Sequence, residues 1–384
     1  MVRYIPAIIV ALFVLLPAGC SHSAETGDSN FSYRVETVSD GLEHPWGMVF
    51  LPGENDLALV TERPGRLNLV DLGSGSRIPV SGLPKIAAAG QGGLLDVALH
   101  PAFDDNRFVY LSYAAAGAAS GQLATHVCQG RLDVRAATIS DVTVLIVAEP
   151  FVSESAHFGS RLVFDNQNRL YVTTGDRRNR DSAQDLTSLH GKTLRIGDDG
   201  AIPPDNPFVG HGYAHPAIFS YGHRNSQGMA VHPETGEIWQ NEHGQRGGDE
   251  INILVKGGNF GWPIATYSRE YATRRPIGVL PPEHEETVDP IYYWENSGFP
   301  PSGMAFYTGD AFEKWQGNLF VGGLRERCLA RLEVTGRTVA QAECLLADRN
   351  LRIRDVRVNP ADGFLYVLVD ARQAPLIRIR PASR

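Results

Sequence analysis

One phrase recurs six times along the 384-residue chain: a short apolar strand, a turn rich in proline, asparagine, aspartate and glycine, and a second apolar strand. The copies begin at Gly47, Asp96, Arg161, Gly228, Gly303 and Asp355. Consecutive starts therefore lie 49, 65, 67, 75 and 52 residues apart. That spacing accommodates four strands with their loops, which is one blade of a β-propeller, better than it fits a helical repeat. The chain shows little 3.6-residue periodicity, so we expect an all-β fold.

The two ends of the chain predict how the ring closes. From Asp355 onward only 30 residues remain, enough for a hairpin and the strand Pro375–Pro381 but short of a complete blade. The strand Phe31–Ser39 precedes the first phrase and can complete that blade, which removes exposed sheet edges. We therefore predict one six-bladed β-propeller over residues 31–384, with four antiparallel strands per blade and a ring closed by strands from both termini. The alternative is a pair of β-sandwiches whose hairpins resemble one another by chance.

The N-terminus has the features of an export signal. Arg3 is followed by the apolar run Ile5–Leu16, which has 12 residues and is too short to span a bilayer. Small residues before Cys20 resemble the cleavage motif of bacterial lipoproteins, although Pro17 stands where that motif prefers leucine. We expect residues 1–19 to be a signal peptide of the lipoprotein type and residues 20–30 a flexible tether. The protein would then be exported, either periplasmic or anchored to the outer membrane through acylated Cys20.

The charge balance limits the possible partners. The chain has 35 Lys and Arg against 43 Asp and Glu, which gives a net charge of −8. That balance disfavours a nucleic-acid partner. Any membrane contact is expected only through the lipid anchor. An anionic ligand would need a local pocket of positive charge.

Three cysteines remain besides Cys20, and an exported chain permits disulfides. Cys328 and Cys344 flank a predicted hairpin that turns near Thr335 and Gly336, so a symmetric hairpin places them opposite each other. We therefore consider a Cys328–Cys344 disulfide. The alternative is that these two and Cys128 are three buried small hydrophobic side chains.

Polar residues that adjoin the repeated phrase are candidates for the site, because propeller sites lie where the blades converge. The glycine-rich turn around Gln91 allows close backbone approach and can present an amide to the axis. His157 precedes the third phrase, and Asp176 follows its second strand. Across the hairpin this carboxylate can orient the imidazole and raise its basicity. The alternative is a structural His–Asp pair.

Two further groups indicate ion binding. Two glycines beside Asp249 and Glu250 make an oxygen-rich loop of the kind that hard cations accept, although it lacks the spacing of an EF-hand. Strand alternation puts Arg352 and Arg354 on one face. Together with Arg325 they would repel one another at the axis unless a polyanion lies there.

Six ordered segments carry a resemblance to a known family. They are Gly90–Leu95, His157–Arg161, Gly222–Gly228, Asn241–Asn252, Lys256–Pro263 and Arg352–Asp355. In these segments the chain resembles the soluble quinoprotein aldose (glucose) dehydrogenases, which use pyrroloquinoline quinone (PQQ). The likeness runs from Leu42 to Ile379 and is nearer to the bacterial aldose sugar dehydrogenases than to the larger glucose-specific enzymes.

The resemblance implies a six-bladed propeller that oxidises an aldose sugar at its anomeric carbon to an aldonolactone, with hydride transfer to PQQ. His157 would be the general base, and Asp176 would orient it. The sequence contains no Cys-x-x-Cys-His haem motif, so we expect the electrons to pass to an external acceptor, a quinone or a cytochrome. The positions that match cofactor-binding residues are Gln91, Arg224, Asn225, Tyr271, Gly323, Leu324, Arg325, Arg352, Ile353 and Arg354.

The resemblance also implies calcium. Backbone carbonyls of Gly244 and Gln245 match the ligands of an ion that bridges the protein to the quinone, and a second, structural ion would lie near Glu250 and the carbonyl of Phe260. Gln245 stands where relatives usually have proline, so we expect weaker calcium binding. Arg325 stands where relatives often have lysine, and we interpret it as a retained cationic contact.

Two other functions compete with this interpretation. One is a calcium-dependent sugar lactonase on a six-bladed propeller, which holds its metal through side-chain carboxylates and amides and needs no arginine cluster. Arg224, Arg325, Arg352 and Arg354 argue against it. The other is a binding propeller that has lost catalysis, which the presence of His157, Asp176 and Gln91 in one chain disfavours.

Overall fold

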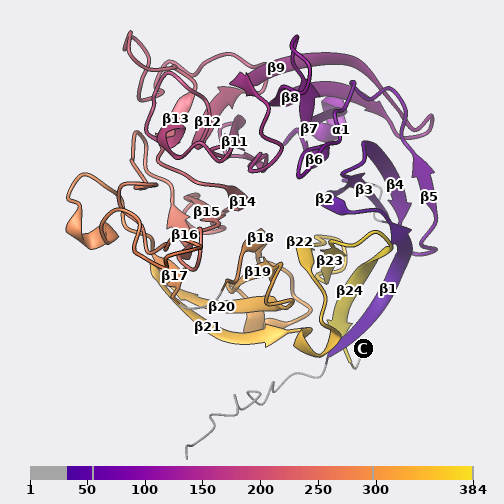
Figure 1. The fold of residues 1–384 in the computed structure, drawn as a ribbon. Coiled ribbons are helices and arrows are strands. Elements are labelled where there is room, and N and C mark those ends of the chain that lie inside the picture. The colour runs from indigo at the N-terminus through magenta and orange to yellow at the C-terminus, as the bar shows by residue number, and fades with distance from the viewer. Residues whose placement is uncertain (1–32, 54–55, 296–297, 383–384) are drawn as a thin grey trace, which may run out of the picture. The chain divides into compact units, whose positions relative to one another are not determined.

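Six four-stranded antiparallel sheets surround a common axis in the computed structural model, which describes residues 33–53, 56–295 and 298–382 (Figure 1). In each blade the repeated phrase supplies the two strands nearest the axis. The predicted all-β, six-bladed propeller is confirmed. The predicted signal peptide, tether and lipid anchor at Cys20 lie outside the described residues.

Five blades take their strands in chain order from the axis outward. They comprise β2 (Pro45–Phe50), β3 (Leu57–Glu62), β4 (Arg66–Asp71) and β5 (Arg77–Pro79); β6 (Leu94–Leu99), β7 (Phe108–Ala116), β8 (Leu123–Asp133) and β9 (Thr138–Val152); β10 (Leu162–Phe164), β11 (Arg169–Thr173), β12 (Lys192–Gly197) and β13 (Ile218–Tyr221); β14 (Ser226–Val231), β15 (Ile238–Glu242), β16 (Asp249–Ile253) and β17 (Tyr292–Trp294); and β18 (Pro301–Phe306), β19 (Leu319–Gly323), β20 (Leu329–Thr335) and β21 (Thr338–Leu345).

The sixth blade joins the two ends of the chain. Its inner strands are β22 (Ile353–Val358), β23 (Leu365–Val369) and β24 (Ala374–Pro381), and its outer strand is β1 (Tyr33–Leu42). β1 pairs antiparallel with β24 from Tyr33 opposite Pro381 to Leu42 opposite Ala374. This pairing confirms the predicted closure by strands from both termini.

The remaining regular elements among the described residues are single helical turns. They are α1 (Phe103–Asn106), η1 (Arg180–Ala183), η2 (Pro281–Glu283), η3 (Glu313–Trp315) and η4 (Ala347–Arg349). The described part of the chain contains no helix that is both long enough and apolar enough to cross a membrane.

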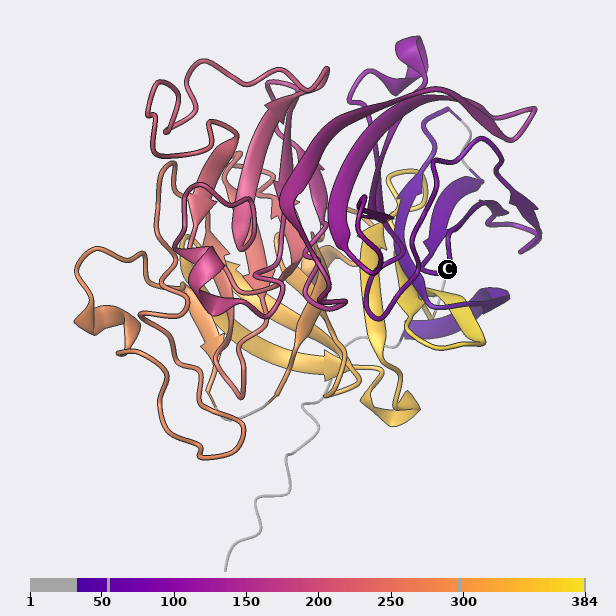
Figure 2. The same ribbon diagram turned by 45° about the horizontal axis from the view of Figure 1, so that its top comes forward.

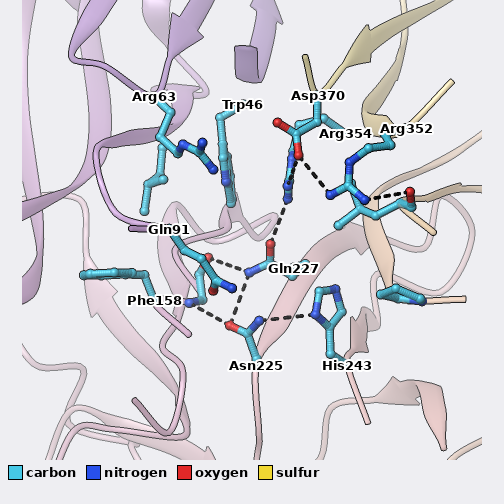
Figure 3. Close-up of a pocket in the computed structure, with 14 residues that line it drawn as sticks. Trp46, Arg63, Gln91, Phe158, Asn225, Gln227, His243, Arg352, Arg354 and Asp370 are labelled. Atoms are coloured by element: carbon cyan, nitrogen blue, oxygen red, sulfur yellow. Dashed lines mark hydrogen bonds and ion pairs between the residues drawn. The ribbon is translucent and has the colours of Figure 1, made fainter. Parts of the chain in front are cut away.

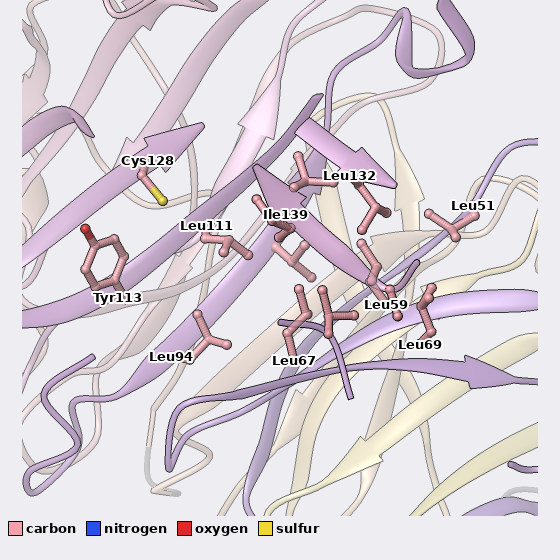
Figure 4. Close-up of a cluster of buried hydrophobic side chains, with 14 of the residues drawn as sticks. Leu51, Leu59, Leu67, Leu69, Leu94, Leu111, Tyr113, Cys128, Leu132 and Ile139 are labelled. Carbon is pink, nitrogen blue, oxygen red and sulfur yellow. The ribbon is translucent and has the colours of Figure 1, made fainter. Parts of the chain in front are cut away.

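Apolar side chains fill the spaces between neighbouring blades, because alternate residues of each strand face the next sheet. Between the first two blades Leu59, Leu69, Leu111 and Ile139 pack together with Cys128 (Figure 4). Burial raises the pKa of the Cys128 thiol to about 12. Cys128 is thus a free, buried and protonated side chain.

A buried ion cluster joins the inner strands at the axis. Arg161, which is fully buried, places Nη1 at 2.9 Å from Asp96 Oδ1 and 3.3 Å from Asp355 Oδ1. The other carboxylate oxygens accept hydrogen bonds from neighbouring blades: Asp96 Oδ2 from the backbone N–H of Leu162, and Asp355 Oδ2 from that of Met48. Arg161 Nε also donates to the carbonyl of Gln227 in β14, at 3.0 Å, so one guanidinium and two carboxylates connect five of the six blades.

This cluster explains why glycine begins other copies of the repeated phrase. A Cβ atom at Gly47 would lie 2.3 Å from Asp96 Oδ1, and one at Gly303 would lie 1.9 Å from Asp355 Oδ1. Both distances are far inside van der Waals contact. Glycine at these two phrase starts is thus a packing requirement of the axis.

The hairpin β20–β21 carries the predicted disulfide. It turns at Gly336 and Arg337, and a register shift between Arg331 and Leu332 places Ala330 opposite Cys344. The expected symmetric register is therefore wrong by two residues. Cys328 and Cys344 are nevertheless joined, with Cα atoms 5.5 Å apart, a separation that disulfides favour.

We expect the soluble form that lacks residues 1–20 to have one titratable thiol when it is unfolded without reductant, because only Cys128 is free. Reduction should raise the count to three. The measurement is a thiol titration in denaturant with and without reductant. Three thiols before reduction would rule out the Cys328–Cys344 bond.

Candidate active site

Two cavities lie side by side where the blades converge. The axial cavity has a volume of about 270 Å³ and is shown in Figure 3; its lining residues are Trp46, Arg63, Gln91, Leu95, Phe158, Gly159, Asn225, Gln227, His243, Pro300, Leu324, Arg352, Arg354 and Asp370. The His157 cavity has a volume of about 410 Å³ and is lined by His157, Asp176, Arg178, Arg180, Arg224, Gln245, Trp262 and Tyr271. Consecutive residues line the two cavities, since Phe158 follows His157 and Asn225 follows Arg224.

His157 and Asp176 meet across the hairpin of the third blade, as the sequence predicts. His157 Nδ1 lies 2.7 Å from Asp176 Oδ1, and Trp262 Nε1 donates to Asp176 Oδ2 at 2.8 Å. Burial raises the pKa of the Asp176 carboxyl, but the hydrogen bond from His157 and the charge of Arg224 outweigh it, so the pKa lies below its usual value. An ionised carboxylate can only accept hydrogen bonds. Nδ1 therefore carries the imidazole proton, and Nε2 is the basic nitrogen.

The protonation of His157 follows from its surroundings. Burial lowers the pKa of this imidazole below its ordinary value, and the charges of Arg224 and Arg178 act in the same direction. The hydrogen bond to Asp176 opposes them only in part. His157 is therefore neutral at pH 7, which is the state a general base requires.

The backbone around this pair is held in unusual conformations. His157, Arg177 and Arg178 have φ values of 54°, 50° and 57°, in the left-handed region. The strand ends approach so closely that a Cβ atom at Gly175 would lie 2.0 Å from the carbonyl oxygen of His157. Left-handed non-glycine residues cost free energy and concentrate at functional sites.

The guanidinium of Arg177 is one anchor of this turn. It is buried, lies 3.7 Å from the ring centroid of Phe158, and donates through Nε to the carbonyl of Ala156 at 2.9 Å. Its other nitrogens donate to the carbonyls of Leu123 and Glu154. Arg177 thereby fixes the turn that carries Asp176.

Arg352 and Arg354 enter the axial cavity from the start of the sixth phrase, as predicted. Both donate to the same oxygen, Asp370 Oδ2, at 3.2 and 3.1 Å (Figure 3). Arg354 also donates to Gln227 Oε1 at 3.0 Å. Burial raises the pKa of the Asp370 carboxyl, but the charge of Arg354 and the hydrogen bond from His44 outweigh it and hold the pKa well below its usual range.

Asp370 corrects one sequence expectation. The repulsion between Arg352 and Arg354 is relieved by this internal carboxylate, so an external polyanion is not needed to explain their proximity. A signal was available, because Asp370 follows the second strand of its phrase just as Asp176 does in the third phrase. Trp46, Arg63, Gln227 and His243 are further lining residues that the sequence analysis missed.

Not every predicted cofactor position reaches a cavity. Gln91, Asn225, Leu324, Arg352 and Arg354 line the axial cavity. Arg224 and Tyr271 line the His157 cavity.

The other three positions lie elsewhere. Gly323 and Ile353 are buried in β19 and β22, and neither lines a cavity. Arg325 is exposed and lines neither cavity, contrary to the expectation that it points at the axis.

Oxygen donors gather in the Gly244–Gln245 loop that the resemblance assigns to calcium. Gly244 N donates to Asp249 Oδ1 at 2.9 Å, and Gly244 O accepts from Arg224 Nη1 at 2.8 Å. Burial raises the pKa of Asp249 to about 7. The Gln245 side chain lies between Arg180 and Glu270, at 2.6 and 2.8 Å, which anchors the loop. Backbone carbonyls beside a carboxylate suit a hard cation.

The second predicted calcium position is a buried acidic group. Burial raises the pKa of Glu250 well above its usual value, and the charge of Glu242 adds to this. Asn252 Nδ2 donates to both carboxylates, at 3.0 and 3.3 Å, while its Oδ1 has no partner among the described residues. Phe260 stacks on His223, whose imidazole contacts Glu242. In the described residues no three His, Cys, Asp or Glu side chains are grouped for a metal, so a cation here would depend on carbonyl ligands.

We expect Asp370→Asn to lower the free energy of unfolding by about 3 kcal/mol, because it leaves buried Arg354 without its charge partner. Glu43→Gln is the matched control. It breaks an ion pair with Arg66 whose side chains are 43% and 47% exposed, and should cost less than about 1 kcal/mol. Urea unfolding of both variants measures the difference. Equal losses would show that Asp370 does not hold the arginines.

Known proteins match almost the whole chain. The family model described as glucose/sorbosone dehydrogenase matches residues 42–378. Aldose sugar dehydrogenase YliI of Escherichia coli (strain K12) is 42% identical over 376 residues, covering 97% of this chain and 99% of the relative. Quinoprotein glucose dehydrogenase B of Acinetobacter calcoaceticus is 26% identical over 437 residues, covering 94% of this chain and 90% of the relative.

Solved structures agree. The apo-form of the soluble aldose sugar dehydrogenase from Escherichia coli has a TM-score of 0.86 at 42% identity and covers 91% of this chain and 100% of its own. The PQQ-bound aldose sugar dehydrogenase from Streptomyces coelicolor has a TM-score of 0.73 at 27% identity, covering 91% and 98%. The chain therefore belongs to the glucose/sorbosone dehydrogenase family of oxidoreductases.

Proposed function

We propose that this protein oxidises aldose sugars at the anomeric carbon to aldonolactones, with PQQ and calcium as cofactors and an external electron acceptor. The observation that carries the proposal is the neutral, carboxylate-oriented His157 in a cavity that adjoins a second cavity lined by arginines. Relatives named quinoprotein glucose dehydrogenase and PQQ-bound aldose sugar dehydrogenase support the choice of cofactor.

His157 is the general base of the proposed reaction. Its Nε2 takes the proton of the anomeric hydroxyl, and the imidazolium that forms is stabilised by the Asp176 carboxylate. The bond from Trp262 keeps that carboxylate in place during the transfer. PQQ, when bound, supplies the carbonyl carbon that accepts the hydride from the sugar.

The axial cavity fits a polycarboxylate. Arg352 and Arg354 offer guanidinium donors, of which Arg352 has a side chain that is 42% exposed. Gln91 and Asn225 add amides to the lining of this cavity. Arg224 lines the adjoining His157 cavity, and its Nε has no partner among the described residues. These donors would hold the carboxylates of PQQ. Trp46, placed between Arg354 and buried Arg161, supplies an aromatic wall.

Carbonyl oxygens of Gly244 and Gln245 would hold the calcium that belongs with the quinone. A divalent cation there would act as a Lewis acid beside the reacting carbonyl. The Arg180–Gln245–Glu270 contacts hold this loop, and a second calcium would lie near Glu250 and the carbonyl of Phe260. The geometry does not support the lactonase alternative. A lactonase needs no arginine cluster, whereas Arg352 and Arg354 line the axial cavity.

The experiment that tests the proposal is dye reduction by the form that lacks residues 1–20, with glucose and a panel of other aldoses. Activity should require both quinone and calcium, each omitted in turn. In the same assay His157→Ala should bind quinone normally and lose at least about 100-fold in kcat, the scale of a general base. Arg352→Ala should instead weaken quinone binding, measured by absorbance titration.

Three results would contradict parts of this scheme. No turnover with any aldose, with quinone and calcium present, would overturn the proposed activity. Unchanged kcat in His157→Ala would remove this residue as the base. Unaltered quinone affinity in Arg352→Ala would remove Arg352 from the cofactor site.

We further expect the acid limb of kcat/KM to fall below the ordinary histidine pKa of about 6.5, because burial lowers the pKa of His157. A base with a lowered pKa stays deprotonated to lower pH. The hydrogen bond to Asp176 raises that pKa, so Asp176→Asn should move the limb to still lower pH while it reduces kcat. A limb that does not move in this variant would show that another group titrates. The measurement is a pH profile of both proteins.

A further inference from the structure

A hairpin of the long connection between β16 and β17 lies at the mouth of the His157 cavity. Arg269 and Pro276 form an antiparallel bridge, and Arg274 N donates to Glu270 O at 3.0 Å. Within this hairpin Tyr271 lines the cavity and is 60% exposed. The connection, orange in Figures 1 and 2, projects beyond the strands of its blade.

Four arginines surround Tyr271 and define what we call the basic rim: Arg246, Arg269, Arg274 and Arg275. All four are exposed. Arg246 Nη1 donates to the carbonyl of Tyr271 at 3.3 Å, and Arg269 Nη1 donates to that of Arg274 at 3.4 Å. Among the described residues none of the four has a carboxylate within ion-pair distance. Their charges are therefore open to solvent.

The carboxylates of the same connection do not cancel this charge. Glu270 is paired with Arg180, a lining residue of the His157 cavity, through two bonds at 2.7 and 2.9 Å. Among the described residues the acidic stretch Glu283–Glu286 makes no ion pair with the basic rim, and Glu283 Oε2 accepts a hydrogen bond from Leu280 N at 3.4 Å. A patch of positive charge thus lies beside the catalytic cavity of a chain whose net charge is −8.

A role for that patch comes from the proposed function and rests on it. Oxidation of an aldose breaks the C1–H and O1–H bonds and forms the lactone C=O, which releases two electrons and two protons. Either one two-electron acceptor or two molecules of a one-electron acceptor take the electrons; a one-electron carrier leaves the protons to solvent. The sequence contains no haem-attachment motif, so the acceptors come from outside. Positive charge at the rim does not attract a neutral sugar, but it does attract a negatively charged electron acceptor.

We propose that the basic rim is the docking surface of an acidic one-electron carrier protein. The negative charge of the rest of the molecule repels such a carrier, and the rim attracts it, so the two together orient the encounter at the cavity mouth. Tyr271 then lies between the carrier and the cavity.

The test compares electron acceptors of opposite charge, using enzyme loaded with quinone and calcium and a saturating aldose. The acceptors are ferricyanide and hexaammineruthenium(III), followed by two c-type cytochromes of similar potential and opposite net charge. The variant is R269Q/R274Q/R275Q. Its matched control, R34Q/R77Q/R135Q, removes the same charge from exposed arginines of β1, β5 and the β8–β9 turn.

At low ionic strength the rim variant should lose about tenfold in kcat/KM for ferricyanide and for the acidic cytochrome, the lower end of electrostatic steering effects. The cationic acceptors should lose nothing, and kcat/KM for the aldose should not change. At about 1 M salt, where charges are screened within about 3 Å, the loss should vanish. The control variant should behave as the wild type.

The outcomes separate the two proposals. If the rim variant keeps the wild-type kcat/KM for every acceptor, or if the rim and control variants lose the same amount, the basic rim is not a docking surface. Either result would leave the proposed dehydrogenase activity intact. A raised KM for the aldose in the rim variant would assign the arginines to substrate and also overturn docking. A loss with ferricyanide but none with the acidic cytochrome would show attraction of small anions only, which overturns docking as well. No reduction of any acceptor would overturn the proposed activity itself, and docking with it.

Discussion

The Arg161 guanidinium, held between Asp96 and Asp355 at the axis, is the interaction on which the rest of this structure depends. It is buried, so its charge must be matched within the protein, and both partners come from other blades. The carboxylates then reach the backbone of the inner strands β2 and β10. These bonds fix the distances between the inner strands of the linked blades, and so help to define the space around the axis. On the cavity side the same guanidinium lies 4.3 Å from the ring of Trp46, which lines the axial cavity.

The same arrangement of a carboxylate and a basic side chain occurs twice in the site. In the third phrase and in the sixth, a carboxylate stands just after the second strand and receives a basic group from the start of the first strand: Asp176 receives His157, and Asp370 receives Arg352 and Arg354. The two groups differ in the basic side chain that the carboxylate binds, and this difference gives them different chemistry. An imidazole with a lowered pKa can exchange a proton near neutral pH, whereas a guanidinium remains a fixed charge. A repeated fold thereby supplies both a base and an anion-binding wall.

Most of the fold could be predicted because the repeated phrase reports strand, turn and strand directly, and closure follows from the strands at the two ends. The His157–Asp176 pair could be predicted because both residues flank one hairpin. Features that depend on packing between elements could not. Arg325 is exposed although its neighbour Leu324 lines the cavity, and one register shift in β20–β21 displaces Cys344 from the expected position. Asp370 had a signal in the sequence, its place after the second strand of its phrase, but its contact with Arg352 and Arg354 depends on packing.

The seam between β1 and β24 has a consequence for how the molecule is made. Residues 33–42 have no partner until residues 374–381 are also present, because only that late segment offers the hydrogen bonds that complete the sixth blade. Consecutive strands can form the other five blades, but the ring stays open until the two ends of the chain meet. A chain that lacks either end therefore keeps an unpaired sheet edge.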